Sequence, residues 1–321
     1  MNGFVCLDKP QGITSFIAAA RVKRILGEKK AGHTGTLDPL ATGVLPVAVG
    51  SATRFIELIP DHDKAYRATF LFGKSTDTLD ITGNVLSETA VSVKREDVEA
   101  VLPLFTGESM QLPPMYSALK KDGVRLYELA RQGKEVEREK RKIRIDSLSL
   151  VGQNGNEYTV DVSCSAGTYI RSLIFDIGEK LGCPAVMTGL TRTKANGIPL
   201  EKCVTIEEFE KLKNEGRLEE AIIPVDKLLS YPAVYVTKPQ AVRFSNGGEL
   251  DLERIKCEKT DGLRLVYSPE RVFLGVGGVN LESGALEVKK VIPGSQGDAN
   301  PGVHGTLLKA ECPSREMSYK I

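Results

Sequence analysis

A single carboxylate, Asp38, lies in a stretch of glycine, proline and threonine from Gly32 to Pro46, close after His33. Such a stretch is a poor helix or strand interior, because glycine adopts unusual backbone angles and Pro39 disfavours the α region for Asp38. A defined loop of this kind can hold a carboxylate against a ligand, as nucleophilic or acid–base chemistry requires. Asp-Pro is also a common turn opener, so Asp38 as a turn cap is the alternative. The local pattern leaves both interpretations open.

The elements next to this loop are indicated by apolar patterning and by start and stop residues. Phe4–Leu7 is expected to be a short strand. Ser15 is expected to cap a helix over Phe16–Leu26 that ends at Gly27. Val44–Val49 is expected to be a strand or buried segment that follows the loop. The loop with Asp38 is therefore expected between a helix and a buried strand.

The rest of the chain alternates between helix and strand patterns. Helices are expected over Thr53–Ile59, Lys94–Leu104, Thr168–Leu181 and Glu207–Asn214, and strands over Tyr66–Phe72, Lys142–Leu150 and Tyr158–Ser163. Because there is no strict βαβ rhythm, we predict an α+β fold with a mixed, mostly antiparallel sheet flanked by helices.

The segment Pro224–Pro232 is expected to be a domain junction, because the pattern beyond it becomes β-rich. Strands separated by Gly-Gly and Ser-Gly turns are expected over Ala233–Val236, Leu263–Tyr267, Val272–Val276 and Ala285–Val291. The last segment, 293–321, shows no clear period and is expected to be a mobile tail. The length of 321 residues suits two domains.

The composition argues against several classes of protein. A hydrophobic content of 41% and a charged content of 26% are typical of a soluble globular protein. No apolar run approaches a membrane span, and the N-terminus lacks the layout of a signal peptide. The six cysteines are scattered without a Cys-x-x-Cys pair, and the three histidines are dispersed, so neither a metal site nor a disulfide framework is indicated. We expect reduced thiols and a cytoplasmic location.

The charge is unevenly distributed although the formal net charge is only +1. Residues 120–144 hold ten Lys or Arg against five acidic residues, whereas residues 201–226 are acidic in compensation. A local basic patch can bind phosphates even when the whole protein is near neutral. The alternative is an ordinary solvated face, which is the commoner fate of mixed charge runs.

Several motifs together resemble those of the TruB family of tRNA pseudouridine synthases. Gly32–Pro39 with Ala41–Leu45 resembles the catalytic motif of that family, and Leu7–Ser15 resembles its N-terminal motif. Further matching motifs lie at Lys64–Ala68, Gly73–Asp80, Gln111–Lys120 and Gly167–Leu173. Their order over the first two thirds of the chain argues against a chance match.

The resemblance implies the organisation of the chain as well as its fold. It implies a pseudouridine synthase catalytic domain over residues 1–228, with a flexible basic thumb at about 123–142 that closes over an RNA stem-loop. It also implies a small PUA-like RNA-binding domain over 233–292. The match is looser in this second domain than in the catalytic part.

The resemblance also assigns roles to three residues. Asp38 matches the catalytic aspartate of the family, and Arg171 matches the arginine that pairs with that carboxylate. A guanidinium can bind a carboxylate through two hydrogen bonds and keep it ionised. Tyr66 matches the tyrosine that stacks on the target uracil. Without the motifs, a helix-surface arginine and a core tyrosine would be the simpler interpretations.

Further positions are implied to bind the substrate. Tyr169 and Leu190 match residues that line the base pocket, although the sequence around Leu190 is less basic than the family pattern. His33 matches the histidine that fills the space left by an extruded uridine, and a lone loop histidine is its alternative. Lys9 is expected to help organise the loop of Asp38 and is a candidate phosphate contact.

The implied activity is isomerisation of a uridine, at position 55 in the TΨC loop of tRNA, to pseudouridine. The reaction needs no redox step, energy input or metal, so we predict no cofactor. We expect tRNA as the partner, no protein or membrane partner, and a monomer. The rivals are a guide-RNA-dependent relative, which tends to carry strongly basic tails, and an RNA chaperone that has lost catalysis. An unrelated globular protein would require all of these ordered motifs to be accidental.

Overall fold

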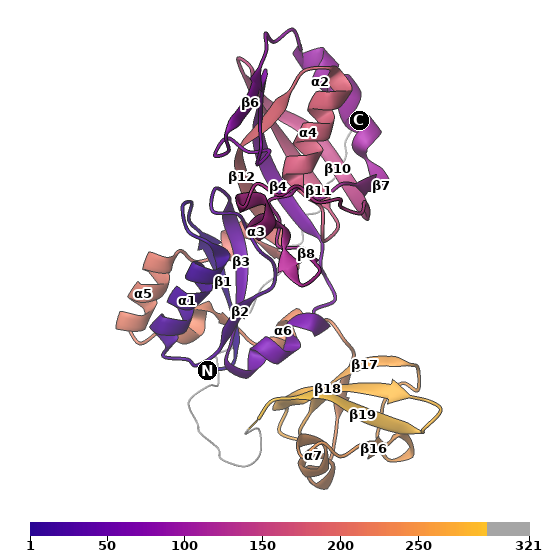
Figure 1. Ribbon diagram of the computed structural model, residues 1–321. Coiled ribbons are helices and arrows are strands. Elements are labelled where there is room, and N and C mark those ends of the chain that lie inside the picture. The colour runs from indigo at the N-terminus through magenta and orange to yellow at the C-terminus, as the bar shows by residue number, and fades with distance from the viewer. Residues whose placement is uncertain (294–321) are drawn as a thin grey trace, which may run out of the picture.

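A ten-stranded mixed sheet forms the main body of the protein in a computed structural model that describes residues 1–293 (Figure 1). Eight strands lie side by side across the sheet in the order β14 (Ile222–Ile223), β1 (Gly3–Lys9), β3 (Thr42–Val49), β12 (Ala185–Ala195), β4 (Lys64–Phe72), β11 (Glu157–Cys164), β10 (Arg141–Asn154) and β7 (Gly107–Gln111). Two short strands, β2 (Ala31–His33) and β13 (Ile198–Pro199), pair with β3 and β12. Within this described sheet the β3–β12 pair is parallel and the other strand pairs are antiparallel. The predicted α+β fold with a mostly antiparallel sheet is confirmed.

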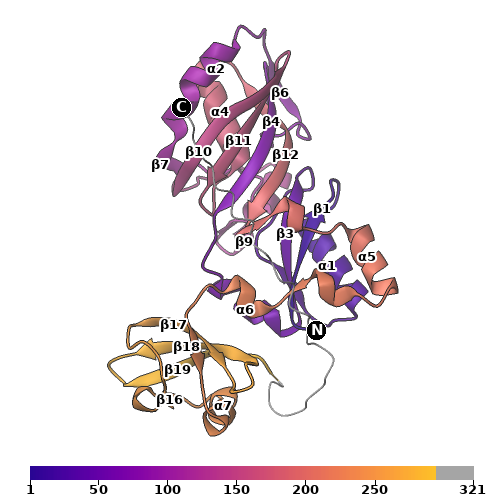
Figure 2. The ribbon, with the colours of Figure 1, turned by 180° about the vertical axis from the view of Figure 1, so that it is seen from behind.

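The N-terminal strands of this sheet are buried on both faces. In β1, Val5 and Leu7 belong to one apolar core and the alternating Phe4 and Cys6 belong to another. Two helices, α1 (Ser15–Leu26) and α5 (Ile206–Asn214), lie side by side next to these strands in both views (Figures 1 and 2). A continuous apolar run suits such a strand, because neither face meets water.

The helix ends follow the capping residues with two corrections. The N-cap of α1 is Thr14, whose side chain accepts a hydrogen bond from the Ile17 amide, so the prediction of Ser15 as the cap is wrong by one residue. The predicted stop at Gly27 is confirmed, with a left-handed φ of 68° that glycine tolerates. Helix α4 (Ile170–Leu181) begins two residues after the predicted Thr168.

The central strand β12 is not indicated by the sequence pattern. It pairs with both β3 and β4, and register shifts interrupt its pairing with β4 between Met187 and Gly189 and between Arg192 and Lys194. Such irregularities break the two-residue alternation by which strands are recognised. This strand nevertheless carries Leu190 to the pocket described below.

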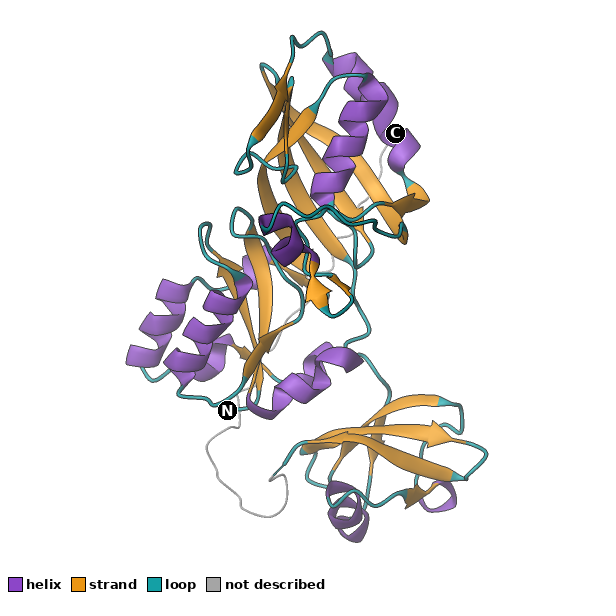
Figure 3. Cartoon of the chain, in the orientation of Figure 1, coloured by secondary structure: helices purple, strands orange, loops and turns teal. Residues whose placement is uncertain are grey.

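The remaining elements of the body surround this sheet (Figure 3). They are the 3-10 helices at Gly50–Leu58, Leu102–Phe105, Leu200–Lys202 and Leu218–Ala221, the helices α2 (Arg95–Val101) and α6 (Val225–Leu228), and the hairpin of β5 (Lys74–Thr76) with β6 (Val85–Glu88). The basic segment contains β8 (Lys120–Lys121), β9 (Val124–Arg125) and α3 (Leu126–Arg131). Between residues 120 and 140 only Leu126 is buried, so this segment has almost no core of its own.

A second, five-stranded sheet forms the C-terminal domain. Its order is β15 (Ala233–Tyr235), β17 (Gly262–Tyr267), β18 (Phe273–Asn280), β19 (Ala285–Val291) and β16 (Leu250–Asp251). The predicted β-rich composition is confirmed, whereas α7 (Lys238–Ser245) and the 3-10 helix Leu252–Arg254 are additions that the pattern does not indicate. The predicted tail lies outside the described residues from position 294 onward.

Candidate active site

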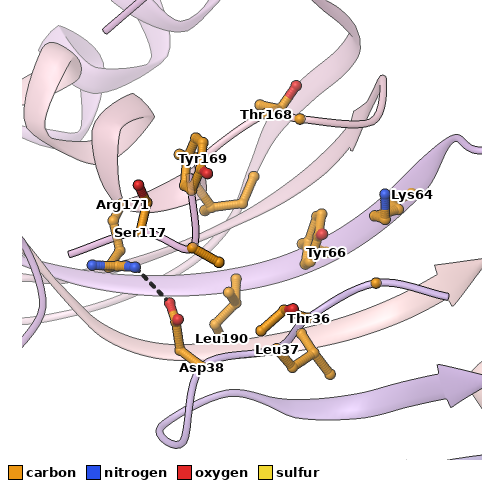
Figure 4. Close-up of a pocket in the computed structure, with 14 residues that line it drawn as sticks. Thr36, Leu37, Asp38, Lys64, Tyr66, Ser117, Thr168, Tyr169, Arg171 and Leu190 are labelled. Atoms are coloured by element: carbon orange, nitrogen blue, oxygen red, sulfur yellow. Dashed lines mark ion pairs between the residues drawn. The ribbon is translucent and has the colours of Figure 1, made fainter. Parts of the chain in front are cut away.

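Five segments that are distant in sequence meet around one cavity of about 240 Å³ (Figure 4). The lining residues are Gly35, Thr36, Leu37, Asp38, Lys64, Tyr66, Ser117, Ala118, Gly167, Thr168, Tyr169, Ile170, Arg171 and Leu190. The structure therefore brings together Asp38, Tyr66, Tyr169, Arg171 and Leu190 from the sequence prediction. His33 and Lys9 are not among the lining residues.

An ion pair joins two of the lining residues. The Asp38 carboxylate lies 2.8 Å from an Arg171 guanidinium nitrogen, with the side chains 37% and 6% exposed respectively. Because Arg171 is buried and Asp38 is partly open, the pair presents its carboxylate to the cavity. A guanidinium in this position binds the carboxylate and limits its rotation.

The direction of the Arg171 side chain is fixed by further acceptors. Its guanidinium donates hydrogen bonds to the carbonyl oxygens of Thr78 and Tyr116, at 2.8 and 2.9 Å. The Asp80 carboxylate lies 3.8 Å from its Nε and itself accepts hydrogen bonds from Thr78 and Thr82. Asp80 thus braces a turn and also neutralises part of the charge of Arg171.

The loop that carries Asp38 is tied to the segment that precedes and begins α1. The Ser15 hydroxyl accepts from the Leu37 amide and donates to the Leu37 carbonyl, at 2.7 and 3.0 Å. The Gly12 amide donates to the Pro39 carbonyl at 2.7 Å. The Ser15 hydroxyl is thus hydrogen-bonded to the loop, which explains why Thr14 is the N-cap of α1.

Arg192 stabilises the loop that carries Asp38 through hydrogen bonds to backbone carbonyl oxygens. This arginine is 1% exposed and donates to the carbonyl oxygens of Val44 at 2.7 Å and Gly35 at 3.1 Å. Among the described residues it has no ion-pair partner of opposite charge, and burial lowers its pKa. Backbone carbonyl oxygens therefore compensate most of its buried charge.

Tyr66 forms part of the cavity wall from strand β4. Its side chain is largely buried, and that burial raises the pKa of the phenol to about 12, with nearby Arg192 acting in the opposite direction. The phenol accordingly keeps its proton at neutral pH. Its ring lines the cavity, as stacking on a bound base requires, and its hydroxyl interacts with the Arg192 guanidinium.

Tyr169 is fixed by a buried glutamine. The Gln111 side chain accepts from the Tyr169 amide at 2.8 Å and donates to the Tyr169 carbonyl at 3.1 Å. Burial raises the pKa of the Tyr169 phenol. The segment that precedes Arg171 is therefore held at a set position, directly before the first turn of α4.

Two family models match consecutive parts of the chain. One, described as TruB family pseudouridylate synthase (N terminal domain), covers residues 23–170, and the other, tRNA pseudouridylate synthase B C-terminal domain, covers residues 171–230. The chain belongs to the TruB family. It is a tRNA pseudouridine synthase, an isomerase.

Curated relatives support this membership over almost the whole chain. A tRNA pseudouridine synthase B from Pseudomonas fluorescens is 44% identical over 296 residues, which is 91% of this chain and 96% of that protein. One from Shewanella amazonensis is 41% identical over 302 residues, 91% of this chain and 95% of that protein. One from Azoarcus is 44% identical over 296 residues, 91% of this chain and 95% of that protein.

Solved structures support the pseudouridine synthase fold. A crystal structure of a Cbf5–Nop10–Gar1 complex gives a TM-score of 0.67 at 28% identity, covering 90% of this chain and 84% of that chain. An H/ACA ribonucleoprotein bound to a substrate RNA containing 2′-deoxyuridine gives a TM-score of 0.67 at 26% identity, with the same coverage.

Two predicted site residues of this TruB-family chain lie beside the cavity instead of in it. His33 is in β2, and burial together with Arg192 lowers the pKa of its imidazole. Its Nδ1 is buried without a hydrogen-bond partner among the described residues. The ring is therefore neutral, which suits packing against a base more than binding a phosphate.

Lys9 is fully buried, and its ammonium donates to the carbonyl oxygens of Pro10 and Ile13, both at 2.8 Å. The prediction that Lys9 touches a phosphate is wrong for this structure, because the side chain has no exposed surface. Burial lowers the pKa of Lys9 to about 8, and Asp38 opposes that effect. Lys9 instead organises the turn that contacts the loop of Asp38.

Lys64, Ser117 and Arg192 belong to the site but have no role that the sequence indicates. Lys64 lies two residues before Tyr66 on the same strand, so alternation along a strand could have placed both on one face. No comparable signal marks Arg192, because its contacts join segments far apart in the chain. Within residues 1–293 no group of three or more His, Cys, Asp or Glu is placed to hold a metal ion, and none of the described helices is long and apolar enough to span a membrane.

Proposed function

We propose that the chain converts the uridine at position 55 in the TΨC loop of tRNA to pseudouridine. The observation that carries the proposal is the Asp38–Arg171 ion pair at the wall of a cavity that Tyr66 also lines. The cavity size suits a single nucleobase, so the uridine must leave its stack to enter it. The tRNA pseudouridine synthase B relatives, which match over nearly their full length, support tRNA as the substrate.

The chemistry is an isomerisation in which atoms are conserved. The bond from C1′ to N1 of uracil breaks, the base turns, a bond from C1′ to C5 forms, and the proton on C5 is lost while N1 gains one. Asp38, held in place by its ion pair with Arg171, serves as nucleophile or base against the ribose or the uracil. Tyr66 stacks on the base, and its hydroxyl can assist removal of the C5 proton.

Extrusion of the uridine costs a few kcal/mol of unstacking, and a side chain that fills the vacancy offsets part of that cost. His33 takes this role in the proposal, because it is neutral and adjoins the loop of Asp38. The basic thumb and the C-terminal domain, which the sequence predicts to be PUA-like, contact the RNA outside the cavity. The enzyme acts as a monomer without a cofactor.

The deciding experiment is incubation of the purified protein with an unmodified tRNA transcript, followed by chemical adduct mapping of pseudouridine. We expect one new pseudouridine, in the TΨC loop, without any added guide RNA. A product at another position would overturn the assignment of the site. Conversion only in the presence of a second RNA would favour the guide-dependent alternative.

A further inference from the structure

Lys64 contributes an ammonium group to the cavity, and no described residue forms an ion pair with it. Its Nζ has one hydrogen bond within residues 1–293, to the His62 carbonyl oxygen at 3.3 Å. The neighbouring Asp63 carboxylate lies 2.7 Å from Arg144 instead. In Figure 4 the ring of Tyr66 lies between Asp38 and Lys64. One end of the cavity therefore holds the Asp38–Arg171 ion pair, and the other end holds the ammonium of Lys64, which has no ion-pair partner among the described residues.

A second cation reinforces the positive charge at this end. A β-carbon built on Gly35 would lie 3.5 Å from Cε of Lys64 and 3.6 Å from a guanidinium nitrogen of Arg192. Burial and the charge of Arg192 both lower the pKa of Lys64, and Cys164, Asp63 and Asp61 oppose them. Two cations packed against one glycine, neither in an ion pair with any described carboxylate, form a site that favours an anion.

Buried hydroxyl groups line the same cavity. The Thr168 Oγ1 and Ser117 Oγ atoms have no hydrogen-bond partner of good geometry among the described residues. The Cys164 thiol and the Tyr169 phenol lie near these two hydroxyls, and a thiol is only a weak partner for Thr168. Gly167 has a φ of 86° and open space where a side chain would be. Because these two hydroxyl oxygens have almost no accessible surface, they form part of the cavity wall and leave Lys64 as the donor that faces a ligand.

We propose that Lys64 binds a backbone phosphate next to the uridine that is flipped into the cavity. This inference rests on the proposed function. The ribose must lie at Asp38 for the glycosidic bond to react, and the phosphates flank the ribose. A lysine suits a phosphate as a point charge with three donors, whereas it has no acceptor for the N3–H of uracil. The contact would hold the ribose against Asp38 and offset part of the cost of flipping.

The test combines protein variants with neutral RNA linkages. An RNA stem-loop of the TΨC arm is made in three forms: unmodified, and with a methylphosphonate replacing the phosphate on the 5′ or the 3′ side of the target uridine. The full-length proteins are wild type, Lys64→Met, Lys64→Arg and Thr168→Val. Lys211→Met is the matched control, because that lysine is 76% exposed on α5. Affinity is measured at several salt concentrations.

We expect Lys64→Met to weaken binding of the unmodified stem-loop about tenfold and to reduce the salt slope by about 0.7 units, the value for one contact on a single strand. Lys64→Arg should restore most of both. One of the two neutral linkages should weaken wild type by a similar factor and leave Lys64→Met unchanged. Thr168→Val, which removes a hydroxyl that has almost no accessible surface, and Lys211→Met should both match wild type.

Wild-type affinity and salt slope in Lys64→Met would overturn the inference. The inference would also be overturned if each neutral linkage weakened RNA binding by wild type and by Lys64→Met to the same extent. A loss of conversion with an unchanged salt slope would assign Lys64 to the uracil and also overturn the phosphate contact. These binding measurements are separate from pseudouridine mapping, so a failure of the proposed function shows as absent conversion by wild type.

Discussion

The cavity that Asp38 and Arg171 line and the contact of the C-terminal domain with the body are held together by different interactions. Around the cavity, buried polar side chains make hydrogen bonds to backbone atoms, as Arg171 does to Thr78 and Tyr116 and Arg192 does to Gly35. Hydrogen bonds and ion pairs have preferred directions, so they fix the orientation of a reacting group. This is what a carboxylate that must meet one atom of a substrate requires.

The C-terminal domain joins the body mainly through apolar side chains. Leu265 and Val276 from its sheet share a core with Phe4 and Phe55 of the body, and the rings of Phe55 and Phe273 lie 6.0 Å apart. Figures 1 and 2 show α6 between the two sheets. Hydrophobic contact has no direction, and it places one surface against another without aiming a single atom. We therefore propose that the cavity carries the chemistry and that the domain contact places a long RNA.

The largest effect should follow from Asp38→Asn, which tests the cavity side of the comparison. The amide has nearly the shape of the acid but is neither nucleophile nor base. We expect pseudouridine formation to fall by about 10³-fold or more, with tRNA affinity within a few-fold of wild type. Single-turnover assays and binding titrations measure the two quantities. Turnover close to wild type would remove Asp38 from the mechanism.

A smaller loss is expected for Tyr66→Phe, which keeps the aromatic face and removes the hydroxyl. If the hydroxyl assists removal of the C5 proton, turnover should fall about 10²-fold while binding is retained. Tyr66→Leu, which lacks both features, serves as the comparison and should fall further. Near-normal turnover by the Phe variant would leave stacking as the only role of Tyr66.

The apolar contact is tested by Phe273→Ala. Loss of its packing against Phe55 and Tyr267 should lower the free energy of unfolding by about 1 to 3 kcal/mol, since the ring is only partly buried. Affinity for full tRNA should fall several-fold, whereas turnover on a saturating stem-loop should stay at the wild-type value. Leu281→Ala, at a side chain 48% exposed in the same domain, is the control. If turnover on the stem-loop fell by the same factor as affinity for full tRNA, the cavity and the domain contact would not have separate roles.

The smallest effect should come from the basic run that leads into β10, where Lys140, Arg141 and Lys142 are neutralised together. The ammonium of Lys142 already lies 2.8 Å from Glu108, so it offers less to a phosphate than its charge suggests. We expect a modest loss of affinity for tRNA and for the stem-loop alike, with the salt slope reduced by about 2 units. A matched triple variant at Lys202, Lys211 and Lys213 is the control. An unchanged slope would identify the basic run as a solvated face.

Much of the fold follows from local patterns. Thr14 and Gly27 are good helix-end residues, and the apolar run of β1 suits a strand buried on both faces. Strand β12 escapes prediction because its register shifts hide the alternation. Helix α7 escapes because Thr237 and Gln240, which form its capping box, stand between β-rich segments. Local signals fail where an element gains its stability from neighbours far along the chain.

The sequence by itself determined the family, the α+β fold and the identities of Asp38, Tyr66 and Arg171 as candidates, because motif residues and their order are properties of the chain. Only the tertiary structure decided that Asp38 and Arg171 form an ion pair, that Lys9 is buried, and that Lys64 faces the cavity without an ion-pair partner among the described residues. The physical reason is that burial and charge pairing depend on which segments pack together. In the sequence, a lysine that is enclosed by carbonyl oxygens cannot be distinguished from a lysine that faces a ligand site.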